Sequence, residues 1–517
     1  MKYAVTQMQL DVKGQELADL EILSFTCAEK ISAPYQYTVR FLTSTETITQ
    51  TLAGKQVSFQ YGVEGLLARM EPAYVHGFIS THNVLGLSLS RKYITQIVIL
   101  PRLSLLSYSG QRQVSGTTSP IKMHELAQAM LNPATFKQNT STAAQFADEQ
   151  PIDCDVPGDI VSTQRNFVLQ YYESDLDFFR RILEQDGIFF FISNDETKDV
   201  VNFGDKNQVF KEIKEKISYV PDNVPNAPQT EYIRSLTMQT TFAEKESYAR
   251  DYNYDNAGQS AKYLRSHAVD PNGGGATVTY DDHFETTSDG VRYAQLHAEK
   301  LLTWQTQYFC ATNSTRLRPG VLFNLDTDER KLSSFIQRFL VVKSSTNFSQ
   351  ASADVPGSSA AAFTNSLICL ALPADATTFR PFPSQQKPRV QGVLNAIIDN
   401  DSSGSVAKVE SNGTYRIRLI EEESTTTRLP AGKASADVRQ MQPFGGGGGT
   451  GLQFPLYKGT EVLLAFVEGD PDRPVIVGTV ANSENKSVLE GIDSSLSINK
   501  TNVIRTSSGI SIELIDG

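Results

Sequence analysis

Residues 452–480 read LQFPLYKGTEVLLAFVEGDPDRPVIVGTV, and this stretch decides which fold the C-terminal part of the chain adopts. The run at 462–467 is apolar at nearly every position, and the run at 475–480 is rich in β-branched residues. Such runs are typical of strands that are buried on both faces. The stretch therefore predicts two neighbouring strands with a short connection.

The connection is the sequence Gly-Asp-Pro-Asp-Arg-Pro at 469–474. Asp470 can bond the backbone ahead of it, and Pro471 presets the φ angle that the second position of a type I turn needs. The stretch is thus predicted to be a hairpin with a stiff, charged tip. Asp470, Asp472 and Arg473 are expected to be turn and salt-bridge residues without a catalytic role.

A longer pattern runs through this hairpin. Its residues are Gly459, Glu461, Gly469, Asp470, Pro471, Asp472, Arg473, Pro474 and Gly478. The pattern resembles the OB-fold signature of the VgrG family, the trimeric spike proteins of type VI secretion systems, which are similar to the hub and spike of contractile phage tails. The resemblance identifies a fold rather than a reaction.

The first 110 residues predict short strands, because apolar and polar residues alternate in them. Tyr37, Val39 and Phe41 share one face of the stretch 36–42. Evenly spaced strands favour a barrel or a sandwich, and residues 34–39 resemble the early strand of a VgrG hub. A helix is predicted over about 120–131, with Ser119 as its N-cap and Pro120 in its first turn. The other strands are expected at 57–61, 74–79 and 93–100.

Residues 171–191 predict a capped helix followed by a strand. Ser174 with Asp177 three positions later is a capping-box-like start, and Gly187 stands where a left-handed C-cap is needed. The unit resembles the cap–helix–glycine–strand unit of VgrG hubs. The matching residues, which are expected to be structural, are Ser174, Asp175, Phe178, Arg181, Glu184, Gly187 and Ile188.

The rest of the chain completes the expected organisation. A helix is predicted near 290–304, with His297 as a core residue on its apolar face. Arg380 and Pro381, with the sequence 388–392, resemble the junction between a VgrG hub and its OB domain. The expected fold is mainly β, with an α+β hub: tandem barrels with α/β insertions at 1–385, an OB fold at 386–488, and a linker with the start of a trimeric β-helix at 489–517. The resemblance implies that this needle continues beyond residue 517.

Composition excludes several classes of function. The chain of 517 residues carries a net charge of −11, which argues against nucleic-acid binding and against an electrostatic membrane anchor. The N-terminus has no apolar run typical of a signal peptide, so a dedicated machine would have to export the protein. Four cysteines lie far apart and are expected to be buried free thiols. They are Cys27, Cys154, Cys310 and Cys369.

Four stretches contain residues of the types found in metal-binding, cofactor-binding or catalytic sites. Residues 399–410 place Asp399, Asp401, Ser403 and Glu410 at EF-hand spacing, yet strands rather than helices are expected on both sides, which favours an acidic hairpin loop over a calcium site. The glycines of 445–451 match a dinucleotide fingerprint without its strand and helix, so a flexible loop is expected. The acids at 281–283 and 326–329 are expected to be solvated turn residues. No catalytic constellation, metal site or cofactor is predicted.

The resemblance implies a mechanical function. It predicts a homotrimer that caps the Hcp tube within the baseplate, carries a PAAR-type tip protein and effectors or their adaptors, and crosses a target membrane when a sheath contracts. Such a protein is assembled in the bacterial cytoplasm and then secreted or injected. The alternatives are a spike with an enzymatic effector domain beyond residue 517, and the hub-spike of a phage tail or of an extracellular injection system.

Overall fold

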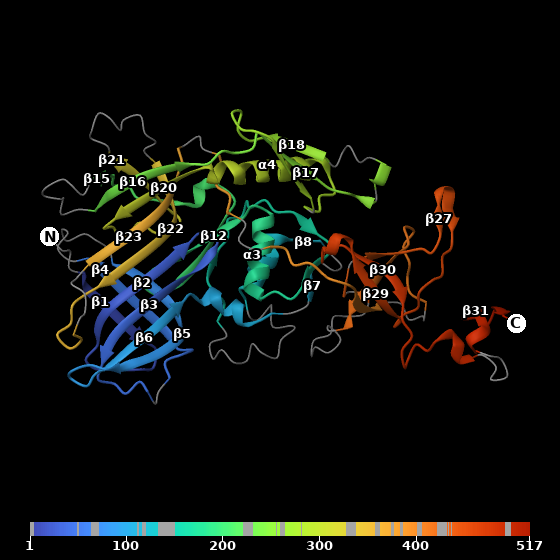
Figure 1. Ribbon diagram of the computed structural model, residues 1–517, viewed down its shortest axis with the longest axis horizontal. Coiled ribbons are helices and arrows are strands. Elements are labelled where there is room, and N and C mark those ends of the chain that lie inside the picture. Colours follow the sequence, from blue (N-terminus) through green and yellow to red (C-terminus); the bar gives the residue numbers. More distant parts are fainter. Residues whose placement is uncertain are drawn as a thin grey trace.

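The molecule is long, with its N-terminal sheets at one end and the C-terminus at the other (Figure 1). Within the described residues, no helix is both long and apolar enough to cross a membrane. The computed structural model describes residues 5–48, 51–63, 72–110, 113–115, 120–132, 150–220, 231–254, 256–258, 264–280, 282–326, 338–356, 362–373, 377–382, 386–400, 406–420, 432, 434–435, 437–491 and 498–516.

One sheet contains thirteen of the described strands. They are β1 (Val5–Val12), β2 (Glu21–Lys30), β3 (Ala33–Thr43), β4 (Gln56–Val63), β5 (Ala73–Leu87), β6 (Tyr93–Leu100), β14 (Lys211–Glu212), β15 (Ile217–Tyr219), β16 (Tyr232–Thr240), β20 (Thr306–Thr312), β21 (Val321–Asp326), β22 (Arg338–Ser349) and β23 (Ala362–Ala371).

The sheet consists of two six-stranded units joined by the pairing of β2 with β22, and the short strand β14 pairs with β21 at its edge. The first unit has the order β1-β4-β5-β6-β3-β2. The second, β22-β23-β20-β16-β15-β21, closes on itself because β21 also pairs with β22. The four strands predicted for the first unit are confirmed, and Tyr37, Val39 and Phe41 are fully buried on one face as their alternation requires.

A helical layer lies between the first unit and the C-terminal barrel (Figure 1). Helix α3 (Asp175–Gln185) begins as predicted, because the Ser174 side chain accepts a hydrogen bond from the Asp177 amide at 3.1 Å. Helix α1 was expected to start at Pro120 but starts at Met123, since Ile121 and Lys122 instead pair as a short strand. Ser119, the predicted N-cap, lies outside the described residues. The layer's other elements are η1 (Arg102–Tyr108), β7 (Gln113–Ser115), β8 (Ile121–Lys122), α1 (Met123–Met130), β9 (Cys154–Asp155), β10 (Gln164–Arg165), β11 (Val168–Gln170), β12 (Phe189–Asn194), β13 (Asp199–Gly204) and η4 (Asn207–Val209).

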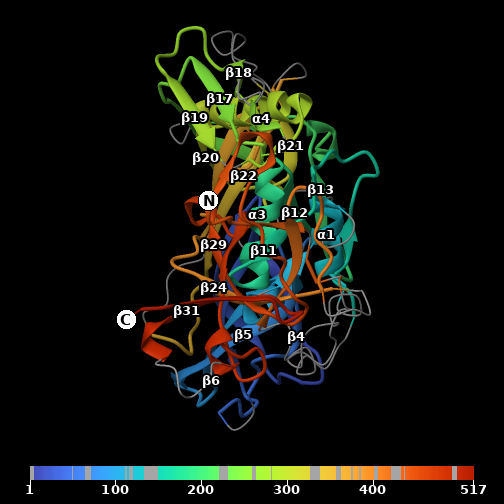
Figure 2. The same ribbon diagram turned by 90° about the vertical axis from the view of Figure 1, so that its right-hand side faces the viewer.

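Helix α4 (Thr287–Gln305) confirms the helix predicted near 290–304 and packs against a small side sheet. That sheet has the order β18-β17-β19 and lies along one long side of the molecule (Figures 1 and 2). His297 on α4 is mostly buried, with its Nε2 2.9 Å from an oxygen of Asp282. The strands of the side sheet are β17 (Glu246–Arg250), β18 (Leu264–Ala268) and β19 (Ala276–Tyr280).

A closed five-stranded barrel follows, with the order β24-β25-β26-β30-β29. The predicted hairpin is β29 and β30, but the prediction that both faces are buried was wrong. Val462, Leu464 and Phe466 are buried while their neighbours are partly exposed, because a small closed barrel encloses only one face of each strand. The strands are β24 (Leu394–Ile398), β25 (Thr414–Leu419), β26 (Asp437–Gln440), β29 (Glu461–Phe466) and β30 (Pro474–Thr479).

The glycine-rich segment is a small exposed hairpin rather than the expected irregular loop. Gly445 and Gly446 pair with Thr450 and Gly451, and the hairpin projects from the barrel (Figure 1). Its elements are β27 (Gly445–Gly446), η6 (Gly447–Gly449) and β28 (Thr450–Gly451), and the barrel's remaining short helices are η7 (Val467–Gly469) and η8 (Val488–Gly491).

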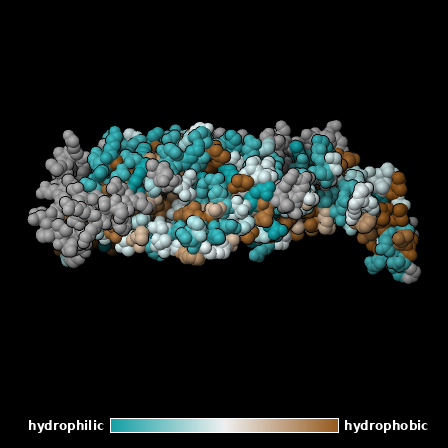
Figure 3. All heavy atoms as spheres, turned by 90° about the horizontal axis from the view of Figure 1, so that it is seen from above, coloured by the Kyte–Doolittle hydropathy of each residue, from teal (hydrophilic) through white to brown (hydrophobic). Residues whose placement is uncertain are grey.

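A last hairpin, β31 (Thr501–Arg505) with β32 (Ser511–Ile515), follows η9 (Ile498–Lys500) near the C-terminal end. Ile504, Ile512 and Leu514 are each more than half exposed. Hydrophobic residues gather at this end of the molecule (Figure 3). A two-stranded sheet cannot bury its own apolar side chains, which accounts for their exposure.

Candidate functional site

The charged turn of the predicted hairpin lies buried at the junction between the barrel and the rest of the chain. The Arg473 amide donates to the Asp470 carbonyl at 3.0 Å, and the Asp472 amide donates to Oδ1 of Asp470 at 3.0 Å. These bonds confirm the predicted turn. Asp470 is only 3% exposed and Asp472 only 7%, so the tip is not a solvent-facing one.

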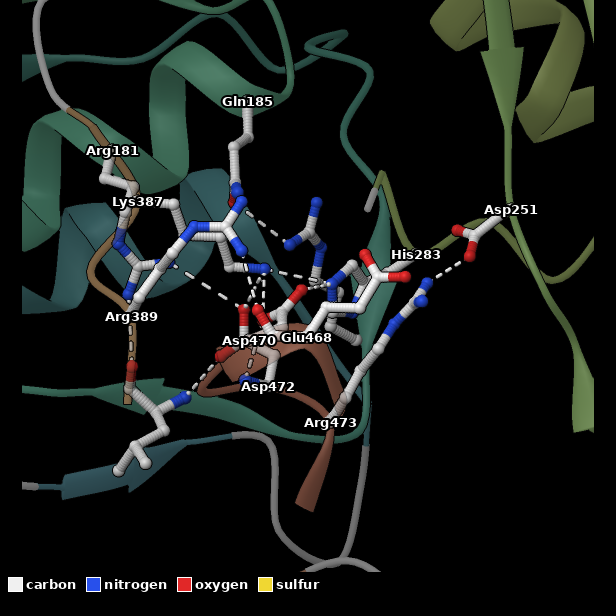
Figure 4. Close-up of polar contacts among 12 residues, drawn as sticks. Arg181, Gln185, Asp251, His283, Lys387, Arg389, Glu468, Asp470, Asp472 and Arg473 are labelled. Atoms are coloured by element: carbon white, nitrogen blue, oxygen red, sulfur yellow. Dashed lines mark hydrogen bonds and ion pairs between the residues drawn. The ribbon is translucent and has the colours of Figure 1, made fainter. Parts of the chain in front are cut away.

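Four charged or titratable side chains meet there, and we call them the junction cluster: His283, Lys387, Asp470 and Asp472 (Figure 4). The Lys387 ammonium lies 2.6 Å from Oδ1 of Asp470 and 3.1 Å from Oδ2 of Asp472. His283 Nε2 lies 2.6 Å from Oδ2 of Asp470 and 2.9 Å from Lys387 Nζ. One ammonium thus compensates two carboxylates that a single turn brings together.

The two short contacts of His283 Nε2 cannot both be hydrogen bonds. Nε2 either carries a proton and donates to Asp470, or is bare and accepts from Lys387. The shorter contact is to the carboxylate, and a bare nitrogen 2.6 Å from it would be repelled, so Nε2 carries the proton. Lys387 then donates only to the two carboxylates.

Burial and neighbouring charges set the proton affinities of the cluster. Burial lowers the pKa of His283, and the charge of Lys387 lowers it further, against the opposing effect of Asp470. Burial alone would raise the pKa of Asp470, but His283 and Lys387 hold it far below its usual value. The pKa of Asp472 is also lowered, because Lys387 and Arg181 outweigh its burial. Both acids are therefore charged at neutral pH.

Asp472 ties the turn to the helical layer. Its Oδ1 accepts a hydrogen bond from the Leu169 amide at 2.8 Å, and its Oδ2 lies 3.8 Å from Nη1 of Arg181 on α3. Arg181 in turn holds Glu173 at 2.7 Å. The buried core of the barrel also continues into this layer, since it includes Leu169 and Tyr171.

Three further contacts extend the junction. Arg473 forms an ion pair with Asp251, the residue that directly follows β17 of the side sheet. Arg389 donates to the Glu468 carbonyl at 2.6 Å, and the Val390 amide donates to the Gly469 carbonyl at 2.8 Å. His283 and Glu468 both have positive φ angles, of 59° and 55°. Backbone strain is retained where surrounding contacts over-determine the structure, and here it flanks the junction cluster.

The cluster contains donor atoms suited to a metal ion. One nitrogen of His283 and one oxygen each of Asp470 and Asp472 lie within 4.8 Å of one another. A divalent transition metal accepts such a set. However, Lys387 Nζ already stands within 3.1 Å of all three residues, so its ammonium takes the position of the cation. The arrangement therefore fits a structural ion-pair cluster better than a metal centre.

The other residues of the VgrG-like pattern form buried hydrogen bonds and ion pairs or allow particular backbone conformations. The Asp175 carboxylate accepts from Gln170 Nε2 at 2.7 Å and from Ser109. Arg380 Nε lies 2.6 Å from Oε2 of Glu299, and its Nη1 donates to the Gly187 carbonyl at 3.0 Å. The remaining members are also placed: Gly459 has a φ of 82°, Glu461 accepts from Asn395 and Asn482, Pro471 lies within the turn, Pro474 begins β30, Gly478 is exposed and Pro381 is buried.

The calcium-like stretch is described only in part, because Asp401 and Ser403 lie outside the described residues. Asp399 is buried, and its Oδ2 accepts from Arg418 at 3.1 Å and from the Gly432 amide at 2.8 Å. Glu410 pairs with Lys408 at 2.6 Å. Both described acids are thus engaged with groups of the chain itself.

The prediction of solvated turn residues at 281–283 was wrong for the two residues that are described. Asp282 is bound to His297, and His283 belongs to the junction cluster. Nothing in the sequence marks these pairings, because His283 lies 187 positions from Asp470. Lys387 was missed for the same reason. Asp326 ends β21, and 328–329 lie outside the described residues.

The predicted thiols are free, and three of the four are buried. Cys27, Cys310 and Cys369 are buried, whereas Cys154 is partly exposed. Burial raises the pKa of Cys27 to about 11. The Cys27 thiol is therefore a poor nucleophile at neutral pH.

Comparisons with known proteins match both main parts of the chain. Residues 28–352 match the family model described as phage tail baseplate hub (GPD). Residues 404–480 match the type VI secretion system/phage-baseplate injector OB domain.

Curated relatives are similar over part of their length. The type VI secretion system spike protein VgrG1b of Pseudomonas aeruginosa is 24% identical over 326 residues, which are 62% of this chain and 42% of that protein. The actin cross-linking toxin VgrG1 of Vibrio cholerae is 26% identical over 335 residues, which are 62% of this chain and 29% of that protein. The matched part thus spans less than half the length of these relatives.

Solved structures share the fold. The E. coli c3393 protein, described as a component of the type VI secretion system with structural similarity to T4 bacteriophage tail proteins gp27 and gp5, aligns with a TM-score of 0.61 at 19% identity, covering 91% of this chain and 100% of that chain. A PdpA-VgrG complex in its lidless form aligns with a TM-score of 0.61 at 10% identity, covering 99% of this chain and 94% of that chain. At these identities the likeness concerns the fold alone.

Proposed function

Since the chain belongs to the phage tail baseplate hub family, carries the injector OB domain and is similar to VgrG spike proteins, we propose that it is the spike of a contractile injection machine of the type VI secretion class. In this proposal three copies form the spike, cap the Hcp tube within the baseplate and puncture a target membrane. The hub occupies residues 1–385, the OB domain 386–488, and the linker with the start of the needle 489–517.

The observation that carries this proposal is the exposed C-terminal hairpin. Strands β31 and β32 pair with each other alone among the described strands, and Ile504, Ile512 and Leu514 are more than half exposed. Exposed sheet edges and apolar faces favour association with further strands. A threefold assembly would bury these side chains against two identical hairpins and leave no free edge.

The buried junction cluster supports a mechanical role. A spike must transmit an axial push from the hub to its tip without bending at the connection. Asp470 and Asp472 of the barrel contact His283 and Arg181 of the hub. Arg473 of the barrel pairs with Asp251 of the hub, so several charged contacts hold the barrel to the hub. Breaking any of them would leave a buried charge without compensation, and the connection therefore resists bending.

The same proposal implies which proteins the spike binds and how it leaves the cell. The spike would contact the Hcp tube and baseplate proteins, carry a PAAR-type tip and deliver effectors or their adaptors. It would assemble in the bacterial cytoplasm and leave by injection. A phage-tail or extracellular hub-spike remains the alternative of the same class, because the hub family model is that of a phage baseplate.

A second candidate is a spike that also carries an enzyme. One relative is named an actin cross-linking toxin, and only 29% of it matches this chain. In that case the residues described here would still serve as the delivery device, and the chemistry would lie in a separate domain. Actin or cell-wall assays on the longest natural form of the protein would distinguish the two candidates.

The proposal is tested by the mass in solution from light scattering. One chain has a mass of 57.0 kDa, and the trimer is expected at three times that value. Replacing both Ile512 and Leu514 with Asp should shift the mass toward the monomer without changing the melting temperature of the hub. A monomer at every concentration, in this chain and in a version that continues beyond residue 517, would contradict the spike assignment.

A further inference from the structure

A cavity of about 450 Å³ lies beside the junction cluster, where three parts of the chain meet. One wall is the segment 164–167, a second comes from 251–254 and 283–285, and the third is the outer face of the barrel. The barrel wall includes Arg416 on β25 and Arg439 on β26. These are the second and third strands of the barrel, and that face is the one that OB folds use for ligands.

Most of the charges in this cavity are already paired. Arg473 forms its ion pair with Asp251, and Arg416 lies 3.4 Å from Asp437. Arg439 is different: among the described residues, no carboxylate or carbonyl engages its guanidinium. Instead the guanidinium lies over the ring of Tyr254, 4.3 Å from the ring centre.

Stacking on Tyr254 prepares Arg439 for a ligand. The cation–π contact holds the guanidinium against the ring, and no carboxylate or carbonyl of the described residues takes its N–H groups. A planar fork of N–H donors fits a carboxylate with two parallel hydrogen bonds. Since the fork is held before the ligand arrives, less conformational entropy is lost on binding.

We propose that this cavity binds a carboxylate carried by a segment of a partner protein. Tyr252 and Tyr254 stand at its rim, 57% and 42% exposed. Tyrosine and arginine are the residues that most often dominate binding between proteins. The exposed amide of Asn166 lies in the same cavity and can bond the backbone of an extended segment.

A protein segment suits the cavity better than a free small anion. The chain carries a net charge of −11, so its overall field repels small acids. A small acid gains only the contact with Arg439. A carboxylate within a peptide also gains apolar contact with the two rim tyrosines, which compensates this repulsion. Nucleic acid is disfavoured more strongly than a single carboxylate, because the net charge of −11 repels each of its many phosphates.

The test is a random heptapeptide display library selected on the full chain. We expect the enriched peptides to share an Asp or Glu next to an apolar residue. An enriched peptide is then compared by fluorescence polarisation with a variant peptide in which its Asp is replaced by Asn, or its Glu by Gln. Loss of a charge-assisted bidentate pair should weaken binding by about tenfold or more. This inference does not depend on spike assembly.

Variants locate the binding on the chain. Arg439→Gln should cause the same loss of affinity as replacing the acid of the peptide by its amide. Tyr254→Leu should weaken binding, because the Arg439 guanidinium is no longer held. Arg338→Gln is the matched control, since it removes a partly exposed arginine that pairs with Glu212 at 2.7 Å, away from both the cavity and the last hairpin. Thermal melting verifies that each variant is folded. If Arg439→Gln does not fold, Arg439→Lys keeps the charge, loses the fork and should still bind more weakly.

Several outcomes would overturn the proposal. Enriched peptides without an acid, or binding unchanged in Arg439→Gln, would mean that the cavity does not select a carboxylate. Competition by sodium acetate at the concentration of the peptide would show a small-anion site. Displacement of the peptide by a fluorescent dT15 oligonucleotide would show a nucleic-acid site. A changed oligomeric mass of Arg439→Gln would assign the cavity to contacts between copies.

Discussion

Lys387 has the most demanding position of any single residue at the junction. Its ammonium is the nearest positive charge to both Asp470 and Asp472, which are almost fully buried. Two buried carboxylates on one turn repel each other strongly unless a cation stands between them. The stability of the turn therefore depends on a side chain that lies more than 80 positions earlier in the sequence.

Lys387→Met should reduce the free energy of unfolding by about 3 to 5 kcal/mol, because it leaves buried charges without compensation. The matched control is Lys408→Met, which removes a lysine that pairs with Glu410 at 2.6 Å but is 68% exposed. That change should cost far less stability, because solvent screens an exposed ion pair. Scanning calorimetry measures both, and equal losses would mean that the cluster contributes no more than a surface pair.

Acidification should loosen the junction in two steps. The pKa of His283 is lowered in the folded chain, mainly by burial and then by Lys387. The unfolded chain therefore takes up this proton first, and stability falls as the pH drops below about 6.5. The pKa of Asp470 is held far below its usual value despite burial, by His283 and Lys387, so its contribution is complete above about pH 4 and is lost only in stronger acid.

Melting temperatures between pH 8 and pH 5 check the first step. The wild type should lose more stability over this range than His283→Gln, which has no imidazole to protonate. At pH 8 the variant should be the less stable of the two, because it loses the hydrogen bond to Asp470. Parallel curves for the two proteins would exclude His283 as the titrating group.

At the scale of elements, the end of α3 depends on a glycine. Gly187 has a φ of 72°, and a Cβ at this position would lie 2.6 Å from Cδ2 of Leu296 on α4 and 3.2 Å from Cδ of Arg380. The residue thus lets the helix end, the second helix and the segment before the barrel approach one another. A side chain at this position would be strained by the left-handed backbone and would press on both neighbouring side chains.

Gly187→Ala should therefore destabilise the chain by about 2 to 4 kcal/mol, from backbone strain and overpacking together. Gly14→Ala is the control, since Gly14 has the same φ of 72° but no atom within 4 Å of the added Cβ. It should cost about 1 kcal/mol. The difference between the two melting temperatures measures the packing contribution, and it would vanish if backbone strain alone decided the outcome.

Local elements were predictable where local chemistry specifies them. Three local features depend only on near neighbours in the sequence. They are the Ser174 cap of α3, the glycine after the end of that helix (Gly187), and the alternation of Tyr37, Val39 and Phe41. The partners of Asp470 and Asp472 did not follow from the sequence, because their cations come from distant segments. The one-sided burial of the two strands around the turn also escaped prediction, since an apolar run does not show that a barrel will close.

At the scale of the whole molecule, the junction cluster should make hub and barrel unfold together. Asp472 contacts the Leu169 amide at 2.8 Å and Lys387 at 3.1 Å, so it joins three segments. Asp472→Asn keeps the shape but removes the charge. We expect the single calorimetric transition of the wild type to split into two in this variant. Asp153→Asn, which breaks an exposed pair with Lys198, should leave one transition. A single transition in both variants would mean that the apolar contacts alone couple the two parts.

The pairing of β2 with β22 also affects how the protein is made. Residues 24–30 pair with 343–349, so more than 300 residues must be synthesised after β2 before its partner exists. At ribosomal rates of about 5 to 20 residues per second, that takes roughly 15 to 65 seconds. During this time the nascent chain exposes an unpaired edge beside the aromatic core of its first unit, and such edges invite aggregation. The protein's yield in the cell should therefore depend on ribosome-associated chaperones and on translation speed, and slower decoding of codons 31–343 would prolong the vulnerable period.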